Sequence, residues 1–493
     1  MECSTPSVPG AAHAPLARAM LVLLAVLPWL WPFTPGPSTN AAPLMAAWTC
    51  IALSLLVQAW TGERIAGAAP RAWLIAAAAS ACIALAQWGG VAPDSALLSS
   101  ASIGEAYGNL RQRNQLASLT SLGVATAIWC AGRIGRRRAC AAIVLLAVAN
   151  AATASRTGFV QLLILAGLAI AWPGPRRERG LLAALAVASA VVASLVLPWV
   201  LLHWRGVDMA DVFRRAVGDL GCSSRKVLWS NVLDLVRIHP WLGWGPGELD
   251  YAHFVTLYEG PRFCDILDNA HNLPLHVAAE LGVPLAVGLC AALALVIWRT
   301  RPWRETAATR QLAWAALALV AFHSLLEYPL WYGPFQALVL QCVWILCPSL
   351  AVRRVGRAAS LAVAFAVLVA VAVAAESYTR VTQAYLQPEQ RRPAYRSDPV
   401  HAAQGVWLFE TQRRFAELAI TPLGRANAGH VHDLAQELLH YSPEPAVIEK
   451  LVDAALLLGR RDEAAWYAVR YRAAFPERYA QWMAMGGLSP RLP

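Results

Sequence analysis

Long uninterrupted apolar runs constrain this chain more than any other feature of its sequence. A helix needs about 20 mostly apolar residues to cross the hydrocarbon core of a bilayer, and runs of this kind recur along the 493 residues. Only 14% of the side chains are charged, whereas about a quarter are charged in a typical soluble domain. We therefore predict an all-α, polytopic membrane protein of about 11 transmembrane helices. Their apolar runs begin near Ala19, Ala41, Ala72, Leu116, Ala139, Phe159, Leu181, Leu273, Gln311, Gly333 and Ala358.

The positions of the arginines predict the topology. The formal net charge is +11, which by itself is compatible with nucleic-acid binding, but the arginines gather in every second short loop. This alternation follows the positive-inside rule. We therefore expect the N-terminus in the cytoplasm, the C-terminus outside and no nucleic acid as a partner. The basic loops hold Arg64 and Arg71; Arg133, Arg136, Arg137 and Arg138; Arg176, Arg177 and Arg179; Arg299, Arg301, Arg304 and Arg310; and Arg353, Arg354 and Arg357.

The apolar runs divide the chain into four segments. Residues 1–202 carry transmembrane helices one to seven, residues 203–270 form a large outer loop, residues 271–375 carry helices eight to eleven, and residues 376–493 form an outer helical domain. Within that domain, residues 447–474 predict two amphipathic helices, and the turn between them is similar to half of a tetratricopeptide repeat. A small helical domain packed on the membrane part fits the same residues equally well.

The cysteines bear on metal binding and on the outer loop. None of the ten cysteines has the spacing of a metal site, and we expect neither a metal nor a cofactor. Cys222 and Cys264 both lie in the large outer loop. In an oxidising compartment such a pair forms a disulfide, but two free thiols fit the same sequence, so both interpretations stay open.

Four arginines lie on the outer side of the membrane, where the positive-inside rule disfavours them. Arg111 and Arg113 precede the fourth helix, Arg156 lies between the fifth and sixth helices, and Arg225 lies in the large outer loop. Ionisable groups near membrane depth are costly and usually face a cavity or a partner, and the planar guanidinium binds phosphate oxygens two at a time. We predict that the set binds a lipid-linked phosphate or pyrophosphate. For any single arginine, contact with lipid headgroups is the alternative.

Titratable residues at the outer ends of the eighth and ninth helices are candidates for acid–base chemistry. His271 lies where the large loop enters the eighth helix, and an imidazole at such a boundary works as a general base near neutral pH. A histidine that only caps the helix is the alternative. His323 and Glu327 lie four residues apart and are expected on one helix face, with Glu327 at a height similar to that of His271. His276 and Glu280 form a second such pair, which we interpret as a buried hydrogen-bonded pair.

The segment 239–247 of the outer loop is rich in glycine, proline and tryptophan. Glycine and proline are typical of tight turns. Tryptophan rings stack on sugar faces and equally anchor a protein at a membrane interface, and the sequence does not separate these two roles. No P-loop, dinucleotide fingerprint or Asp-x-Asp nucleotide-sugar site occurs in the chain, which favours an activated donor that is not a nucleotide.

With these residues identified, the chain resembles the bacterial O-antigen ligase and polymerase superfamily, and most closely the PglL-type protein O-oligosaccharyltransferases. His271, Asn272 and Gly282 match the ligase pattern, whereas Leu285 departs from its last position. The other family-like positions are Gln112, Arg113 and Asn114 at the fourth helix; Ser155, Arg156, Thr157 and Gly158; Arg225 and Trp229; and the stretch from His323 through Glu327 and Tyr328 to Tyr332.

The resemblance implies an undecaprenyl-pyrophosphate-linked oligosaccharide as donor, transferred en bloc and without a metal to a hydroxyl. The implied acceptor is a serine or threonine of a pilin or another periplasmic protein, with lipid A-core or a growing O-antigen polymer as alternatives. It also implies a bacterial inner membrane with the active face in the periplasm. His271 would activate the acceptor hydroxyl, Glu327 would orient His271 or bind the acceptor, and the outer arginines would hold the pyrophosphate. The implied supporting residues are Gln112, Asn114, Asn272, His323, Tyr328 and Trp229.

A transporter and a structural scaffold are the alternatives outside this superfamily. A transporter predicts broken helices and ionisable residues near the midplane, often in repeated halves, and the sequence shows no such repeat. A scaffold that binds partners through its helical tail leaves the outer arginines unexplained.

Overall fold

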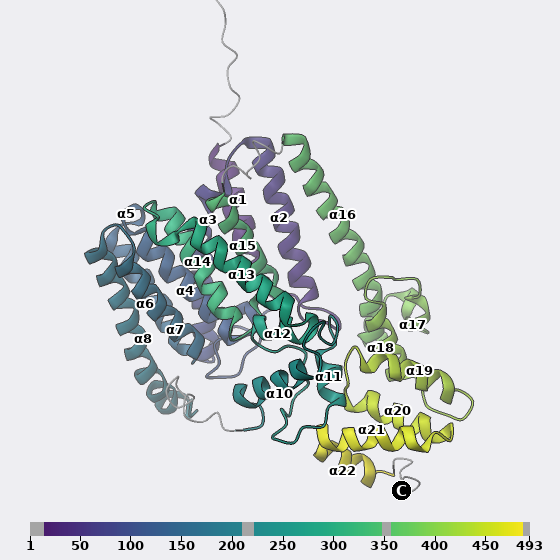
Figure 1. Ribbon diagram of the computed structural model, residues 1–493. Helices are drawn as coiled ribbons and strands as arrows, with labels where there is room; N and C mark the ends of the chain where they lie inside the picture. The colour runs from purple at the N-terminus through teal and green to yellow at the C-terminus, as the bar shows by residue number, and fades with distance from the viewer. Residues whose placement is uncertain (1–13, 210–220, 348–355, 487–493) are drawn as a thin grey trace, which may run out of the picture. The chain divides into compact units, whose positions relative to one another are not determined.

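The computed structural model describes residues 14–209, 221–347 and 356–486, and Figure 1 shows them as helices joined by turns and loops. These residues include 21 α-helices and no strand, so the all-α prediction is confirmed. The chain divides into two units. The first unit comprises residues 1–218 and 299–375, and the second comprises residues 219–298 and 376–493.

Several helices have the length and composition of membrane spans, and the chain is a membrane protein. Among the described residues, five are long and apolar enough to cross a bilayer: α2 (Ala41–Thr61), α3 (Ile65–Trp88), α8 (Arg176–Arg205), the region of α13 (Val283–Arg304) and the region of α16 (Arg357–Tyr385). Shorter helices occupy the remaining predicted runs: α1 (Ala14–Leu30), α4 (Arg113–Trp129), α6 (Arg136–Ala152), α7 (Arg156–Ala171), α14 (Ala308–Ser324) and α15 (Gly333–Leu346). The number of about 11 spans stays a prediction.

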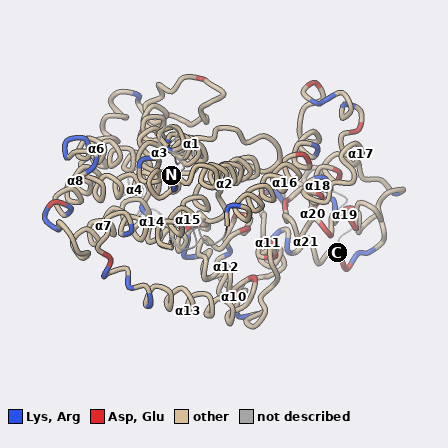
Figure 2. Tube along the Cα trace, turned by 90° about the horizontal axis from the view of Figure 1, so that it is seen from above, with Lys and Arg blue, Asp and Glu red and all other residues tan. Residues whose placement is uncertain are grey.

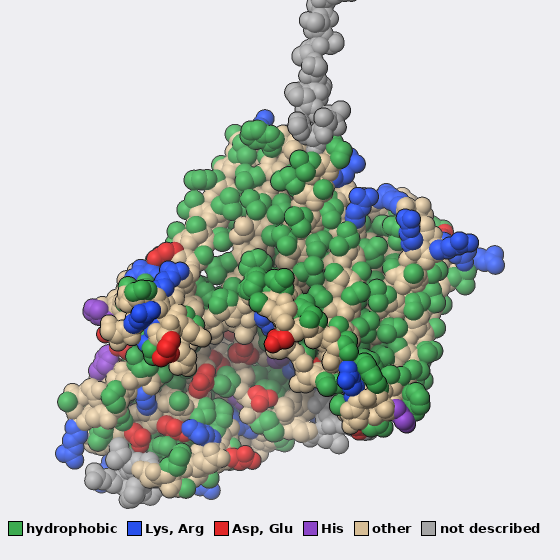
Figure 3. All heavy atoms as spheres, turned by 180° about the vertical axis from the view of Figure 1, so that it is seen from behind, with side chains coloured by type: hydrophobic (Ala, Val, Ile, Leu, Met, Phe, Trp, Pro, Cys, Tyr) green, Lys and Arg blue, Asp and Glu red, His purple; other side chains and the backbone are tan. Residues whose placement is uncertain are grey.

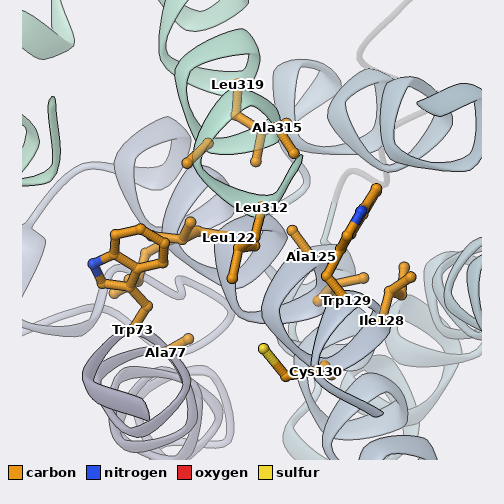
Figure 4. Close-up of a cluster of buried hydrophobic side chains, with 14 of the residues drawn as sticks. Trp73, Ala77, Leu122, Ala125, Ile128, Trp129, Cys130, Leu312, Ala315 and Leu319 are labelled. Carbon is orange, nitrogen blue, oxygen red and sulfur yellow. The ribbon is translucent and has the colours of Figure 1, made fainter. Parts of the chain in front are cut away.

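The core of the first unit is built from small residues that let helices approach closely. Figure 4 shows α3, α4 and α14 meeting through Trp73, Leu122 and Leu312, which are fully or almost fully buried. A Cβ on Gly123 of α4 would lie 2.5 Å from the Cβ of Ala77 in α3. Small residues at such contacts are typical of membrane helix packing, and they hold α4 firmly in the centre of this core.

Much of the outer surface of the first unit is apolar. Figure 3 shows hydrophobic side chains covering large areas of one face, and on α8 Val192, Leu195 and Trp199 are each more than half exposed. Large exposed apolar patches are rare on soluble monomers, and here they fit contact with lipid. Figure 2 shows Lys and Arg grouped at helix ends and turns. Of the predicted basic loops, Arg353 and Arg354 lie outside the described residues.

The second unit combines the outer loop with the C-terminal helices. Phe254, on the short helix α11, is 1% exposed and packs among Leu451 and Tyr471 of the C-terminal helices. The Arg470 guanidinium also donates a hydrogen bond of 2.8 Å to the Val255 carbonyl. The outer loop and the tail therefore share one core. The loop helices are α10 (Arg225–Ile238) and α11 (Leu249–Val255), and α12 (Leu273–Leu281) follows the loop. The tail helices are α17 (Pro399–Ala402), α18 (Glu410–Ile420), α19 (Ala428–Leu439), α20 (Pro445–Leu457), α21 (Arg461–Ala474) and α22 (Pro476–Ala484).

The eighth predicted span differs from its prediction. The sequence predicts one helix from Leu273, whereas the structure forms α12 and then α13 (Val283–Thr300), with a break at Gly282. Gly282 has a φ of +89°, a conformation that favours glycine. A Cβ there would lie 2.0 Å from the Trp241 carbonyl oxygen. The helix breaks because another backbone segment of the same unit packs directly against this residue.

Candidate functional site

The predicted site residues fall into two groups, one in each unit. The first unit holds Arg111, Gln112, Arg113, Asn114, Arg156, His323, Glu327 and Tyr328, and the second unit holds Arg225, Trp229, His271 and Asn272, together with Cys222 and Cys264.

Asn114 joins three elements of the first unit. Its Nδ2 donates a hydrogen bond of 3.0 Å to Oε1 of Glu327, and its Oδ1 accepts one of 2.6 Å from the Ser155 hydroxyl. Glu327 is only 8% exposed, and a buried carboxylate requires hydrogen-bond donors to remain ionised. The first turn of α4, the residue before α7 and the turn after α14 therefore meet at one carboxamide.

Arg113 and Arg156 are the first residues of α4 and α7. The Arg113 guanidinium lies 3.3 Å from the Tyr107 hydroxyl and 4.0 Å from the Glu105 carboxylate, whereas Arg156 is exposed. The bond between Asn114 and Ser155 brings the two helix starts together. Helix N-termini favour anions because their backbone N–H groups point outward. The arrangement therefore combines two guanidinium groups with two helix N-termini.

Arg111 and Gln112 support the backbone before α4. Arg111 adopts a positive φ of 57°, and its guanidinium donates a hydrogen bond to the Pro32 carbonyl. Gln112 caps α4, with its Oε1 accepting a bond of 2.7 Å from the Gln115 N–H. These contacts give both side chains a structural role. Arg111 retains further N–H donors for an anion, because a guanidinium carries five.

His323 lies deeper in the first unit than the carboxylate. It is 1% exposed, and its Nδ1 lies 3.0 Å from the Ser118 hydroxyl, which also accepts a bond of 2.9 Å from Gln161. The sequence did not single out Ser118 or Gln161, whose only signal is a polar residue inside an apolar run. Glu327 follows the end of α14, and its backbone N–H donates a hydrogen bond of 2.8 Å to the His323 carbonyl.

Tyr328 forms an aromatic contact beside this carboxylate. Its ring stacks on Tyr332 with centroids 5.8 Å apart and meets the edge of Trp331 at 6.4 Å. Aromatic pairs in these geometries stabilise a chain segment beyond simple burial. The turn that carries Glu327 is therefore held by ring contacts on its C-terminal side.

In the second unit, His271 occupies a strained turn immediately before α12. Its φ is +49°, and a non-glycine residue in this region costs on the order of 1–3 kcal/mol. The His271 N–H donates a bond of 2.8 Å to Oδ1 of Asn269, and Asn272 caps α12 by accepting a bond of 3.1 Å from Leu275. Such strain is most common at functional sites. Two asparagines thus fix the backbone on either side of this imidazole.

Arg225 and Trp229 lie one helical turn apart on α10, and therefore on one face. The Trp229 indole donates a bond of 3.1 Å to the carbonyl of Ala270, the residue before His271. Because of this contact, the face of α10 that carries Arg225 lies beside the His271 turn. Deeper in α12, Nε2 of His276 lies 3.6 Å from the Glu280 carboxylate.

A disulfide closes the outer loop around this group. Cys222 and Cys264 are bonded, with their Cα atoms 5.5 Å apart and a separation of 42 positions in the sequence. Cys222 precedes Arg225 and Cys264 precedes His271. The bond therefore links the beginning of α10 to the segment that leads into the strained turn.

Three family models match successive parts of the chain. Residues 106–130 match the model described as protein glycosylation ligase, residues 141–290 match O-antigen ligase, and residues 311–486 match the C-terminal region of a virulence factor membrane-bound polymerase. Comparison with curated proteins and with solved structures gave no match. The first match holds Asn114, the second holds His271, and the third holds Glu327.

Proposed function

Because this chain belongs to the O-antigen ligase family, with a protein glycosylation ligase segment and a polymerase-type C-terminal region, we propose that it is an O-oligosaccharyltransferase. It transfers a glycan from undecaprenyl pyrophosphate to a serine or threonine hydroxyl of a pilin or another periplasmic protein. The observation that supports this acceptor is the glycosylation-ligase match at 106–130, whose Asn114 binds the Glu327 carboxylate.

The proposed reaction assigns roles to residues of both groups. His271 takes the proton from the acceptor hydroxyl as its oxygen forms a bond to the anomeric carbon. The bond from that carbon to the pyrophosphate oxygen breaks at the same time. Arg113, Arg156 and Arg225 stabilise the charge that develops on the leaving pyrophosphate, with Arg111 beside them. No metal takes part in this proposal.

Glu327 orients the acceptor or the His271 imidazole in this scheme. Its buried carboxylate, held by Asn114, is a preorganised acceptor for a hydroxyl or an imidazole N–H. The proposal places the chain in a bacterial inner membrane, with its N-terminus in the cytoplasm and with the outer loop and the C-terminal helical domain in the periplasm. That orientation follows from the basic loops.

A second candidate acceptor belongs to the same chemistry. The matches to O-antigen ligase and to a membrane-bound polymerase favour lipid A-core or a growing polysaccharide. Purified protein with one lipid-linked donor, offered a pilin, lipid A-core or a second donor molecule, separates these acceptors. Exclusive transfer to lipid A-core or to the second donor would overturn the protein-acceptor proposal.

The transfer reaction itself is tested at His271. His271→Ala should lower transfer by about 10² to 10⁴-fold, the usual contribution of a general base, while membrane insertion and thermal stability remain those of the wild type. His401→Ala is a matched control, because His401 is exposed in the tail and should transfer normally. Full transfer by His271→Ala would exclude the proposed base.

A further inference from the structure

Two adjacent apolar side chains project from the outer loop of the second unit. Trp241 is 75% exposed and Leu242 is 85% exposed. The other tryptophans of this loop direct their indoles into the protein, since Trp229 donates to the Ala270 carbonyl and Trp244 donates to the Leu235 carbonyl at 3.0 Å. The proposed transfer reaction uses neither Trp241 nor Leu242.

Trp241 and Leu242 form the exposed tip of this loop. The backbone that carries the tip is fixed on both sides. Trp244 N–H donates a bond of 2.9 Å to the Ala279 carbonyl, and Val283 N–H donates one of 2.8 Å to the Pro240 carbonyl. A Cβ on Gly243, whose φ is +70°, would lie 2.3 Å from the backbone carbon of Glu280. Direct backbone packing of this kind admits only glycine. The tip is therefore presented rigidly, without the ordering cost of a flexible loop.

The bond between Pro240 and Val283 also fixes where the tip lies along the chain's membrane surface. Val283 is the first residue of α13, which belongs to a candidate membrane span. The exposed side chains near the start of that helix are apolar, including Leu285 and Val287. Trp241 and Leu242 thus continue the lipid-facing surface of a span at the point where the span begins.

We propose that Trp241 and Leu242 insert into the headgroup region of the bilayer at the N-terminal end of α13. Tryptophan is enriched at this depth because its ring is apolar and its N–H remains wet. The partner is the lipid surface itself, and the tip is a second attachment of the outer loop besides α13. The anchor holds the break at Gly282, from which α12 leads back to His271.

This attachment has a consequence that rests on the proposed function. α12 has nine residues and connects the anchored break to the His271 turn. A helix is rigid over so short a length, so the anchor fixes the height of His271 above the lipid surface. A lipid-linked pyrophosphate lies at that surface, and the anchor therefore sets the distance between base and donor.

The insertion is tested on the full chain in vesicles of phosphatidylethanolamine and phosphatidylglycerol. Leu242→Cys is labelled with an environment-sensitive fluorophore after replacement by alanine of Cys3 and of the free cysteines that are exposed among the described residues, Cys82, Cys290 and Cys347. We expect quenching by spin-labelled lipids and protection from aqueous iodide. Val469→Cys is the matched control, because Val469 is 55% exposed on α21 of the tail and should show the opposite pattern.

The same measurement contains the results that would overturn the insertion. A label at 242 that behaves like the label at 469 excludes the anchor. Protection that appears only after a lipid-linked glycan is added identifies a sugar-stacking platform instead, and also excludes the anchor. Because quenching is read without donor or acceptor, the outcome does not depend on whether the chain transfers a glycan.

The positional consequence has its own experiment. Trp241→Ser combined with Leu242→Ser should keep the thermal stability of the wild type, since both side chains are exposed. We expect transfer by this variant to fall at least tenfold in vesicles and to remain near the wild-type rate in detergent micelles. Equal activity of the variant and the wild type in vesicles would refute the positioning role and leave the quenching result unaffected.

Discussion

The side-chain amide of Asn114 donates a hydrogen bond of 3.0 Å to the carboxylate of Glu327, although 213 positions separate them in the sequence. Asn114 lies in the protein glycosylation ligase match and Glu327 in the polymerase-type match. Ser155 adds a bond of 2.6 Å to the same carboxamide. The two family segments therefore meet at one buried polar contact, directly beside the helix start that carries Arg156.

Asn114→Leu removes this contact while keeping the volume of the side chain. Hydrogen bonds to charged groups contribute about 1.5–3 kcal/mol, so transfer should fall by about 10 to 100-fold. The measurement is the transfer rate of purified protein with a lipid-linked donor. In a double-mutant cycle, Asn114→Leu should lower the transfer rate much less in the Glu327→Gln background than in the wild type. Fully additive losses would show that Asn114 acts independently of the carboxylate.

Arg156→Lys tests whether a forked donor binds the pyrophosphate. Lysine keeps the charge but not the two parallel N–H donors of a guanidinium. We expect the KM for the lipid-linked donor to rise by about tenfold, with the KM for the acceptor unchanged, because one bidentate bond corresponds to about 1.4 kcal/mol or more.

Arg176→Lys is the control for this substitution. Arg176 is also exposed and also begins a helix, α8, but it belongs to a predicted basic loop. Its replacement should leave both KM values unchanged. A donor KM that is the same for Arg156→Lys and for the wild type would remove Arg156 from the donor site.

The helices were predictable because bilayer thickness sets a length that apolar runs reveal directly. The contact of Asn114 with Glu327 was not, since two polar residues at distant positions carry no local signal that they will meet. The same holds for Ser118 and Gln161. A polar residue in an apolar run does not disclose which buried neighbour it will contact.

The hydropathy pattern did not predict the backbone geometry either. The apolar residues continue across Gly282, so the run from Leu273 predicts one helix, and only the approach of the Trp241 carbonyl explains the break. The positive φ of His271 depends on the caps that Asn269 and Asn272 provide. The position of this histidine in the sequence identified it as a candidate, but the sequence did not predict its strained backbone conformation.

The disulfide is expected to stabilise the second unit. For a loop of 42 positions, the chain-entropy model gives about 4 kcal/mol. Cys222→Ser combined with Cys264→Ser should therefore lower the thermal unfolding temperature, and a reducing agent should lower it only for the wild type. Cys82→Ser, at an exposed free cysteine, is the control without effect. An unchanged unfolding temperature in the double variant would contradict the stabilising role.

Asp250 should make the stability of the second unit depend on pH. This residue of α11 is 6% exposed, and burial raises the pKa of its carboxyl to about 8. Between about pH 4 and pH 8 the folded chain therefore binds a proton that the unfolded chain has released. Stability is fully present below pH 4 and is lost as the pH rises, by at most about 1.4 kcal/mol per pH unit.

Asp250→Asn removes that titration and keeps the shape of the side chain. We expect the variant to unfold at a higher temperature than the wild type at pH 8, with a smaller difference at pH 5. Differential scanning fluorimetry across this range gives the comparison. Asp94→Asn, at an exposed residue of the first unit, should show no such trend. A lower unfolding temperature for Asp250→Asn at pH 8 would mean that the buried group is ionised and stabilising.

The break between α12 and α13 can be tested by adding a single methyl group. In Gly282→Ala the new Cβ would lie 2.0 Å from the Trp241 carbonyl oxygen, at a φ of +89°. The substitution should detach the segment that carries Trp241, destabilise the second unit by roughly 3 kcal/mol or more and reduce transfer, because α12 loses its fixed end. Gly288→Ala in α13 meets nothing within 4 Å and should stabilise its helix by about 0.5–1 kcal/mol. Equal unfolding temperatures for the two variants would show that the close backbone contact at Gly282 does not hold the loop.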